Sequence, residues 1–219
     1  MASHHEKLLS DAIQERRATP SFDGMPIPDE DLKRILEAGL SAPSGYNLQP
    51  WRFVVVRTPE QRRRLRSAAF NQAKVEEASA VIVACGDKDG WRTDMDEMIR
   101  MGRENGMTEN YASQAAAVIP EYLGRHPNLI AWLNRHVMIA VTTMMWMAEV
   151  LGYDTAPMEG YEGEKVCEVL RLPLSYEVVA LLGIGHLKGP DKFYGGRFST
   201  RRTVFDEEYG RPSHLFEGQ

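Results

Sequence analysis

The sequence contains few cysteines and no uninterrupted apolar run long enough to cross a membrane. Its two cysteines, Cys85 and Cys167, lie far apart and fit neither a metal-binding spacing nor a disulfide framework. The longest apolar segment, residues 137–151, is broken by two threonines and a glutamate, and it is shorter than the roughly 18–20 residues that a membrane span needs. The N-terminal residues lack the apolar core of a signal peptide. We therefore expect a cytoplasmic protein with no membrane among its partners.

The chain also lacks an excess of positive charge. The chain has 26 lysines and arginines against 31 aspartates and glutamates. Its net charge is therefore negative and gives no reason to expect binding to nucleic acid. The basic run at residues 62–66 contains no aromatic side chain, and we interpret it as a solvated helix face rather than a nucleic-acid site. The histidines show no metal-ligand spacing among themselves, so no metal is expected. Hydrophobic residues make up 43% of the chain, which excludes a disordered protein.

No linker rich in proline, glycine or serine divides the chain, so we expect one domain over residues 1–219. Hydrophobic periodicity and end signals predict helices at residues 7–16, 28–40, 61–70, 128–151 and 163–170. Short apolar runs predict strands at residues 51–56, 80–85 and 177–184. Residues 86–126 are too weakly periodic for helix boundaries to be predicted. Strands separated by helices indicate a layered α+β or α/β fold.

The predicted helix at residues 128–151 is apolar on nearly every face. Asn128 can cap its first turn, and Gly152 can end it. A helix without a polar face must be buried in the centre of the molecule or at a subunit interface. The polar, irregular tail after Gly185 is longer than a connector, and such a tail is uncommon unless it wraps something. Both features favour a homodimer.

Two segments carry groups that could bind a ligand. Arg16 and Arg17 end the first predicted helix and precede an extended segment, so their guanidinium groups could clamp a phosphate. The alternative is a solvated arginine pair at a helix C-terminus, where cations are favoured. The segment from Ser41 to Phe53 places hydroxyl and amide side chains just before a buried strand. This segment is either a binding loop or an ordinary polar turn.

The second segment resembles the signature of a known family. Its pattern Pro43-Ser44-x-x-Asn47-x-Gln49-Pro50-Trp51-x-Phe53 is similar to that of the FMN-dependent nitroreductase family. Other matching segments follow in the family's order: Arg16-Arg17 with Phe22, Asn71-x-x-Lys74, Pro157-Met158-Glu159-Gly160 and Gly195-Gly196-Arg197-Phe198. The resemblance covers about residues 8–211. It implies an α+β fold, namely a three-layer α/β/α sandwich with a mixed, mainly antiparallel sheet and a long central helix. It also implies a variable lid at about residues 86–126 and a C-terminal arm, about residues 186–219, that is exchanged in a homodimer.

The resemblance also implies an enzyme with bound FMN and NAD(P)H as a transient hydride donor. Such an enzyme reduces nitroaromatics, quinones or similar electron-poor acceptors by a ping-pong mechanism. No Gly-x-Gly-x-x-Gly opens a βα unit, so the sequence shows no separate Rossmann site for NAD(P)H. This agrees with the family, in which the nicotinamide and the acceptor use one open pocket in turn. Two alternatives remain. One is a flavin reductase, dehalogenase or enone reductase of the same fold, and the other is an FMN-binding or sensing protein without turnover.

By the same resemblance, each matching position receives a role toward FMN. Arg16, Arg17 and Arg197 match the phosphate ligands. Asn71 matches the partner of the pyrimidine edge, where an amide offers both a donor and an acceptor. The backbone at Glu159 and Gly160 matches the loop whose N–H approaches flavin N5. The alternative is that the Glu159 side chain acts as a general acid. The implied cofactor-binding set is Arg16, Arg17, Ala18, Pro43, Ser44, Gly45, Asn47, Gln49, Asn71, Lys74, Pro157, Met158, Glu159, Gly160 and Arg197.

Both Asn71 and Arg197 have a structural alternative without a ligand. Asn71 could belong to an ordinary turn at the start of a helix, and Arg197 could be one more surface charge. In the family, the loop from Pro43 to Gln49 meets the flavin that is bound mainly by the other subunit. Ser44 and Asn47 would then act in trans.

The chain departs from the family pattern at three positions. Ala18 and Pro20 stand where the family often has a serine and a basic residue that stabilises reduced flavin, a duty that would then fall to Arg16 or Arg17. His136 stands where relatives often carry glutamine, and it either meets the flavin phosphate side or is a capped, buried histidine. Within the expected lid, the plausible pocket liners are Trp91, Met95, Tyr111 and Tyr122, and the candidate ligands of an NADPH 2′-phosphate are Arg103 and Arg125.

Overall fold

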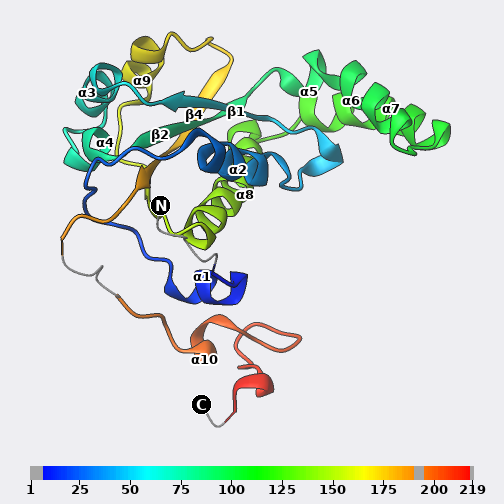
Figure 1. Cartoon of the computed structure of the whole chain (residues 1–219). Coiled ribbons are helices and arrows are strands. Elements are labelled where there is room, and N and C mark those ends of the chain that lie inside the picture. Colours follow the sequence, from blue (N-terminus) through cyan, green and yellow to red (C-terminus); the bar gives the residue numbers. More distant parts are fainter. Residues whose placement is uncertain (1–6, 190–194, 218–219) are drawn as a thin grey trace.

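The computed structural model describes residues 7–189 and 195–217 (Figure 1). The ends of the expected domain and part of the expected arm, at residues 1–6, 190–194 and 218–219, lie outside the described residues. The strands are β1 (Trp51–Val56), β2 (Ala80–Asp87), β3 (Asp154–Met158) and β4 (Tyr176–Gly185). They form one sheet in the order β1-β2-β4-β3, and every neighbouring pair is antiparallel. In the described part of the chain, the parallel component of the expected mixed sheet is a single bridge, between Ala18 and Thr155.

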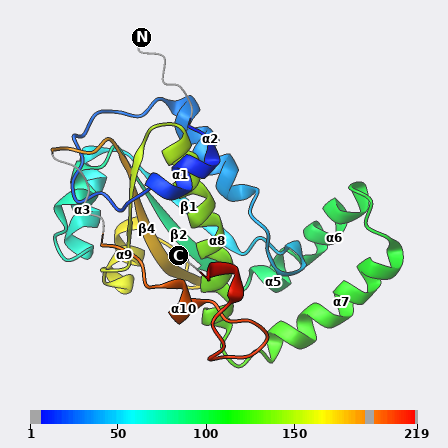
Figure 2. The same cartoon turned by 90° about the horizontal axis from the view of Figure 1, so that it is seen from below.

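Helices cover both faces of this sheet (Figures 1 and 2). One layer contains α1 (Leu9–Glu15), α2 (Asp29–Leu40) and α8 (Leu129–Val150), and the other contains α3 (Pro59–Ala68), α4 (Ala73–Glu77) and α9 (Gly163–Leu170). Side-chain alternation along the strands divides the core accordingly. Ile82 and Leu182 pack toward α2 and α8, whereas Val81 and Leu181 pack toward α3 and α9. The result is the expected three-layer α/β/α sandwich of the α+β class.

The long helix α8 begins and ends as its sequence predicts. The Asn128 side chain accepts a hydrogen bond from the Ala131 amide at 2.9 Å, and Gly152 adopts a φ of +84° after the last turn. Its buried face packs on α2 and the sheet, but Ile139 on another face is 41% exposed. Within the described residues, no helix is both long and apolar enough to span a membrane.

Strand β3 was not predicted. Pro157 lies inside it, and proline cannot donate to a strand ladder. The strand tolerates Pro157 because it lies at the edge of the sheet, where one side of its backbone needs no partner strand.

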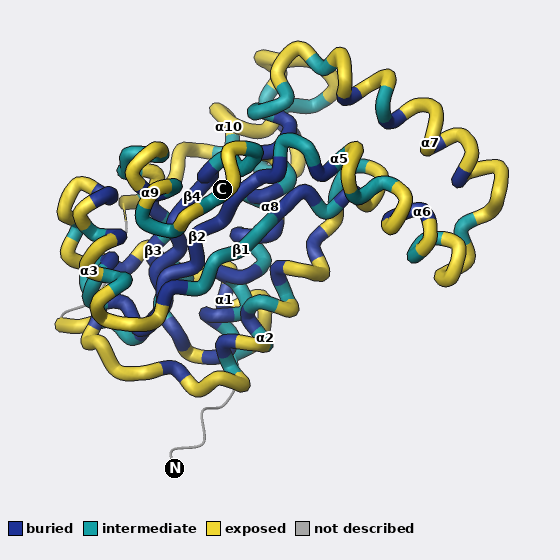
Figure 3. The backbone as a smooth tube through the Cα atoms, turned by 90° about the horizontal axis from the view of Figure 1, so that it is seen from above, coloured by how far each residue is buried: buried dark blue, intermediate teal, exposed yellow. Residues whose placement is uncertain are grey.

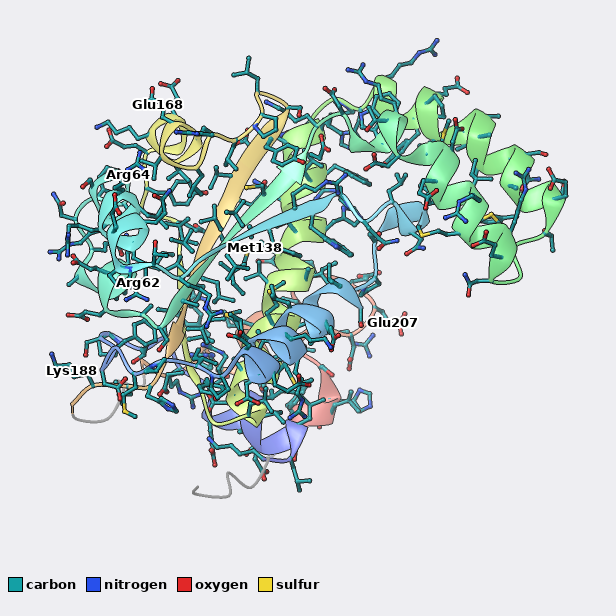
Figure 4. All side chains as sticks on the ribbon, turned by 45° about the horizontal axis from the view of Figure 1, so that its top comes forward. Arg62, Arg64, Met138, Glu168, Lys188 and Glu207 are labelled. Atoms are coloured by element: carbon teal, nitrogen blue, oxygen red, sulfur yellow. The ribbon has the colours of Figure 1, made fainter. Side chains whose placement is uncertain are left out.

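The basic run on α3 is solvated only in part (Figure 4). Arg64 is exposed, as expected. Arg62 instead donates to the carbonyl oxygens of Glu76, Arg57 and Ser79 at 3.1, 2.9 and 2.8 Å. The interpretation as a solvated face is therefore wrong for Arg62, which ties α3 to α4 and to the start of β2.

Two parts of the chain extend away from the sandwich. The lid contains α5 (Gly90–Thr93), α6 (Met95–Glu104) and α7 (Glu109–Gly124), which project from the body in Figures 1 and 3. A hydrophobic cluster that includes Ile119 of α7 and Leu133 of α8 holds the lid to the long helix. The arm, residues 195–217, includes α10 (Thr200–Thr203) and one 3-10 turn (His214–Phe216) and is largely exposed (Figure 3).

Candidate functional site

Three arginines from the two ends of the chain line one cavity. Arg16 and Arg17 follow α1, and the next residues run beside β3, where the Thr19 amide donates to the Thr155 carbonyl at 2.9 Å. Arg197 comes from the arm. The cavity has a volume of about 400 Å³, and its lining residues are Arg16, Arg17, Ala18, Pro20, Gly195 and Arg197. The structure thus brings together the three phosphate ligands that the resemblance implied.

Phe22 fixes this segment to the sheet. Its side chain is 1% exposed and packs over two glycines of β4. A Cβ atom at Gly185 would lie 2.9 Å from the Phe22 ring, and one at Gly183 would lie 3.2 Å from it. The two glycines therefore leave the space that the ring occupies.

Arg16 is partly buried. Burial lowers the pKa of Arg16, the neighbouring Glu149 opposes that shift, and the positive charges of Arg17 and Arg197 lower the pKa further. Its Nη1 atom is buried and, within the described residues, has no hydrogen-bond partner. A buried guanidinium donor without an acceptor, next to two more cations, suits an anion such as a phosphate.

Glu149 lies behind Arg16 and was not singled out from the sequence. This carboxylate on α8 is 5% exposed, and its Oε1 atom is 2.8 Å from Lys7 Nζ. Lys7 also pairs with Glu15 at 2.9 Å. The hydrogen bond to Glu149 raises the pKa of Lys7 against the opposing effect of burial. The available signal was the single acidic residue of a mostly apolar helix, because such a residue needs a cationic partner when it is buried.

The turn at Asn71 meets the loop at Gly160. Phe70 and Asn71 both have positive φ angles, 49° and 56°, so the chain turns sharply before α4. The Gln72 side-chain amide donates to the Gly160 carbonyl at 2.7 Å. The Glu162 amide also donates to the Ala68 carbonyl at 2.8 Å. Two segments with implied roles at the flavin ring are therefore held together, with the Asn71 side chain exposed and Lys74 half-buried behind it.

The other residues implied on the Gly160 side lie where β3 ends. Pro157 and Met158 belong to the strand itself, with Met158 buried. Glu159 is exposed and lines a separate cavity of about 950 Å³ together with Tyr161 and Cys167.

The loop from Pro43 to Gln49 lies at the opposite end of the sheet from the arginines. Trp51, just after the loop, pairs with Gly86, whereas Thr155, beside the arginine segment, pairs with Ile184 and so lies level with Ala80. Within one chain, the structure therefore does not bring Pro43, Ser44, Gly45, Asn47 and Gln49 to the arginine cavity.

This loop has an unusual backbone. Tyr46, Asn47 and Gln49 have φ angles of 55°, 55° and 45°, and the Ser44 hydroxyl accepts the Gln49 amide at 2.9 Å. Non-glycine residues in the left-handed region carry strain that persists at ligand-binding sites.

His136 lies beside this loop rather than beside the arginines. Its Nδ1 atom is 2.7 Å from the Trp132 carbonyl oxygen, its ring lies 4.2 Å from the Trp132 ring, and Gly45 is close to Nε2. Within one chain, His136 therefore packs against Trp132 away from the arginine cavity, and it is partly rather than fully buried.

Arg52 connects this loop to the lid. Its Nη1 atom donates to the carbonyls of Gln49 and Trp51 at 3.3 and 2.9 Å. Its Nη2 atom pairs with Asp94 at the start of α6 and lies 3.3 Å from buried Asp87. Sequence analysis missed this residue, because its partners come from three different elements.

Of the two candidate arginines in the lid, Arg103 already makes a bidentate pair with Glu109 at 2.9 and 2.6 Å. Arg125 is more exposed and lies 3.5 Å from Glu121. Tyr111 and Tyr122 are each 47% exposed, whereas Trp91 and Met95 pack against the cluster inside the lid.

Comparisons with known proteins agree with this architecture. The model of the Nitroreductase family matches residues 13–186. The chain is 37% identical over 175 residues to the NADH dehydrogenase of Thermus thermophilus, covering 80% of this chain and 84% of that protein. It is 27% identical over 183 residues to the CLA biosynthesis enone reductase of Lactiplantibacillus plantarum, covering 81% and 84%. A crystal structure of an Exiguobacterium sibiricum protein in complex with FMN superposes with a TM-score of 0.82 at 28% identity, covering 90% of this chain and 96% of that one.

Proposed function

From the premise that this chain belongs to the nitroreductase family, we propose how its own residues serve an NAD(P)H-dependent FMN oxidoreductase. The proposed reaction takes hydride from NAD(P)H and delivers it to nitroaromatics, quinones or similar electron-poor acceptors in two alternating half-reactions. Bound FMN supplies the ring that accepts and donates hydride, while the chain supplies binding, orientation and charge.

The arginine cavity is the observation that carries this proposal. The buried Nη1 atom of Arg16 has no hydrogen-bond partner within the described residues, and Arg17 and Arg197 add positive charge from both ends of the chain. A phosphate monoester fits this donor set, because guanidinium groups bind phosphate oxygens in pairs. Ala18 and Pro20 line the same cavity and carry no charge. Arg16 or Arg17 would therefore stabilise the negative charge of reduced flavin in place of the family's basic residue.

We assign binding of the flavin ring to the Asn71 turn and the Gly160 loop, which are held together. The exposed amide of Asn71 offers both a donor and an acceptor to the pyrimidine edge, with Lys74 behind it. Gly160, which has no side chain, allows its backbone N–H to approach flavin N5 closely. Glu159 is exposed, and the chemistry assigned here needs no proton from it.

We place the complete site in a homodimer. The loop with Ser44 and Asn47 lies too far along the sheet to serve the arginines of its own chain, so a second copy would supply it. Apolar surface is available for that contact on α1, on α8 and along the arm. The exposed apolar residues there are Leu8, Leu9, Ile13, Ile139, Phe198, Tyr209 and Leu215.

The direct test of the cofactor site is the FMN affinity of Arg197→Ala against that of Arg64→Ala, measured by fluorescence titration of apoprotein. Arg64 is exposed on α3, where its side chain contacts Gln61 at 3.2 Å (Figure 4). Losing a charge-assisted phosphate contact costs about 1.5–3 kcal/mol, so Arg197→Ala should bind FMN roughly ten- to a hundredfold more weakly. Arg64→Ala should match the wild type. Equal affinities for the two variants would remove Arg197 from the site.

The enone reductase relative supports a second acceptor class. Anaerobic protein should be bleached by NADPH or NADH, and a panel of nitroaromatics, quinones and enones should then restore its yellow colour at different rates. Faster reoxidation by enones would favour the second class. A protein that binds FMN but is not bleached by either nicotinamide would be a binding module instead.

A further inference from the structure

Gln72 links the Asn71 turn to the Gly160 loop. Its backbone is fixed at the start of α4, where its N–H donates to Ala69 and its C=O accepts from Val75, both at 3.1 Å. Its side chain then crosses to the Gly160 carbonyl at 2.7 Å. A Cβ atom at Gly160 would lie 3.2 Å from Gln72 Nε2 and 3.6 Å from the Phe70 ring, so the two segments are in direct contact.

The peptide groups on both sides of Gly160 are held. The Glu159 carbonyl accepts from the Tyr161 amide at 3.2 Å. In a trans peptide group the C=O and N–H point in opposite directions, so this contact directs the Gly160 N–H away from Tyr161. The following peptide group is held by Gln72 through the Gly160 carbonyl. Tyr161 is anchored in turn, because its hydroxyl donates to the Val178 carbonyl at 2.8 Å.

We propose that Gln72 is a positioning residue that fixes the backbone at Gly160 and so sets the direction of its N–H toward the flavin. This inference rests on the proposed function. Glycine has wide conformational freedom, so without an anchor the loop can rotate about the backbone angles of Gly160. The anchor requires a donor at position 72, because the group that it meets is a carbonyl oxygen.

The test compares Gln72→Met with Gln61→Met as a matched control. The Gln61 amide also donates to a carbonyl, that of Val169 at 2.9 Å, and it likewise ties the 59–77 region to the 159–170 region. Both variants lose a partly buried amide–carbonyl bond of similar length, and Gln61→Met also loses the exposed contact with Arg64 at 3.2 Å. Only Gln72→Met loses the hydrogen bond to the Gly160 carbonyl.

Two readouts separate positioning from general stability. One is the rate of anaerobic flavin reduction by NADPH or NADH in a single turnover, and the other is the flavin midpoint potential. Loss of one neutral hydrogen bond predicts a roughly threefold to tenfold slower reduction in Gln72→Met, together with a shifted potential. Gln61→Met should keep the wild-type rate and potential, although both variants lower the melting temperature.

A second variant, Gln72→Glu, tests the donor itself. An ionised carboxylate cannot donate to the Gly160 carbonyl, but a protonated carboxyl can. The reduction rate of Q72E should therefore recover as the pH falls toward the carboxyl range of about 4–5, a recovery that Gln72→Met cannot show.

The inference is overturned if FMN-loaded Gln72→Met and Gln61→Met share the wild-type rate and potential, or if Q72E shows no recovery at low pH. Wild-type protein that takes up no FMN would overturn the proposed function instead, and this inference with it.

Discussion

Arg16 and Glu149 are the residues on which the charge balance of the arginine cavity depends. Glu149 is nearly fully buried, and it is close enough to raise the pKa of Arg16 against the effects of burial and of the two other arginines. It also binds Lys7, which joins the start of the described chain to the end of α8 through a backbone bond from Lys7 to Val150 at 3.0 Å. One carboxylate therefore supports both the fold of the N-terminal segment and the cationic cavity.

Glu149→Gln should destabilise the apoprotein by roughly 1–3 kcal/mol, because Lys7 and Arg16 lose a buried counter-charge. Saturating FMN should reduce this deficit, since its phosphate supplies negative charge beside Arg16. Urea unfolding with and without FMN measures both effects. The control is Glu37→Gln, which removes an exposed pair with Lys33 at 3.7 Å and should change the stability by less than about 0.5 kcal/mol. If the loss of unfolding free energy in Glu149→Gln is the same with and without FMN, Glu149 does not contribute to the charge balance of the cavity.

Among the elements, the lid is attached to the body by the contacts of one polar side chain and by an apolar cluster. Arg52 on β1 holds the loop at Gln49, the end of β2 at Asp87 and the start of α6 at Asp94. A second attachment is the apolar cluster in which Leu48, α6 and α7 pack with the start of α8. Under the proposed function, Arg52 would join the lid to the loop that is assigned to the flavin.

Arg52→Met should loosen α5 and α6, with amide hydrogen exchange there about fivefold to tenfold faster than in the wild type. Arg100→Met is the matched control, because Arg100 pairs with Glu97 and Glu104 inside the same helix and, in the part of the chain that the structure describes, holds no other element. Exchange in the lid that is equally fast in the two variants would show that the apolar cluster alone attaches the lid.

The elements were predictable where their signals are local. Trp51–Val56 and Gly163–Leu170 have the predicted bounds, because an apolar strand run and an amphipathic helix each carry their own pattern. Strand β3 was missed because Pro157 contradicts a local strand signal, and only its edge position makes the proline tolerable. Arg62 was interpreted wrongly, because its three carbonyl partners are set by packing between elements.

The site was predictable to a different extent. No periodicity relates Arg197 to Arg16, and their approach was expected only from the family resemblance. The contacts of Glu149 and Gln72 are tertiary as well, so the sequence showed the residues without their partners.

At the scale of the whole molecule, the residues implied in one flavin site occupy two separated regions of the chain. The arginines lie beside β3 and Gly160 follows its end, with the Asn71 turn held to Gly160, so these residues share the β3 edge of the sheet, whereas the loop with Ser44 and Asn47 precedes β1 at the opposite edge. The arm exposes large side chains such as Phe198 and Tyr209, which are 70% and 93% exposed. A second copy would both cover this surface and complete each site, which accounts for the two observations together.

The measurement that tests this account most directly is complementation between two inactive variants. One variant carries Arg16→Ala with Arg197→Ala, and the other carries Ser44→Ala with Asn47→Ala. After mild denaturation and subunit exchange, each heterodimer should contain one intact site, so the mixture should recover part of the NAD(P)H-dependent reductase activity that neither parent has. No recovery after verified exchange, or a wild-type protein that sediments as an FMN-loaded monomer at micromolar concentration, would contradict a site shared between two chains.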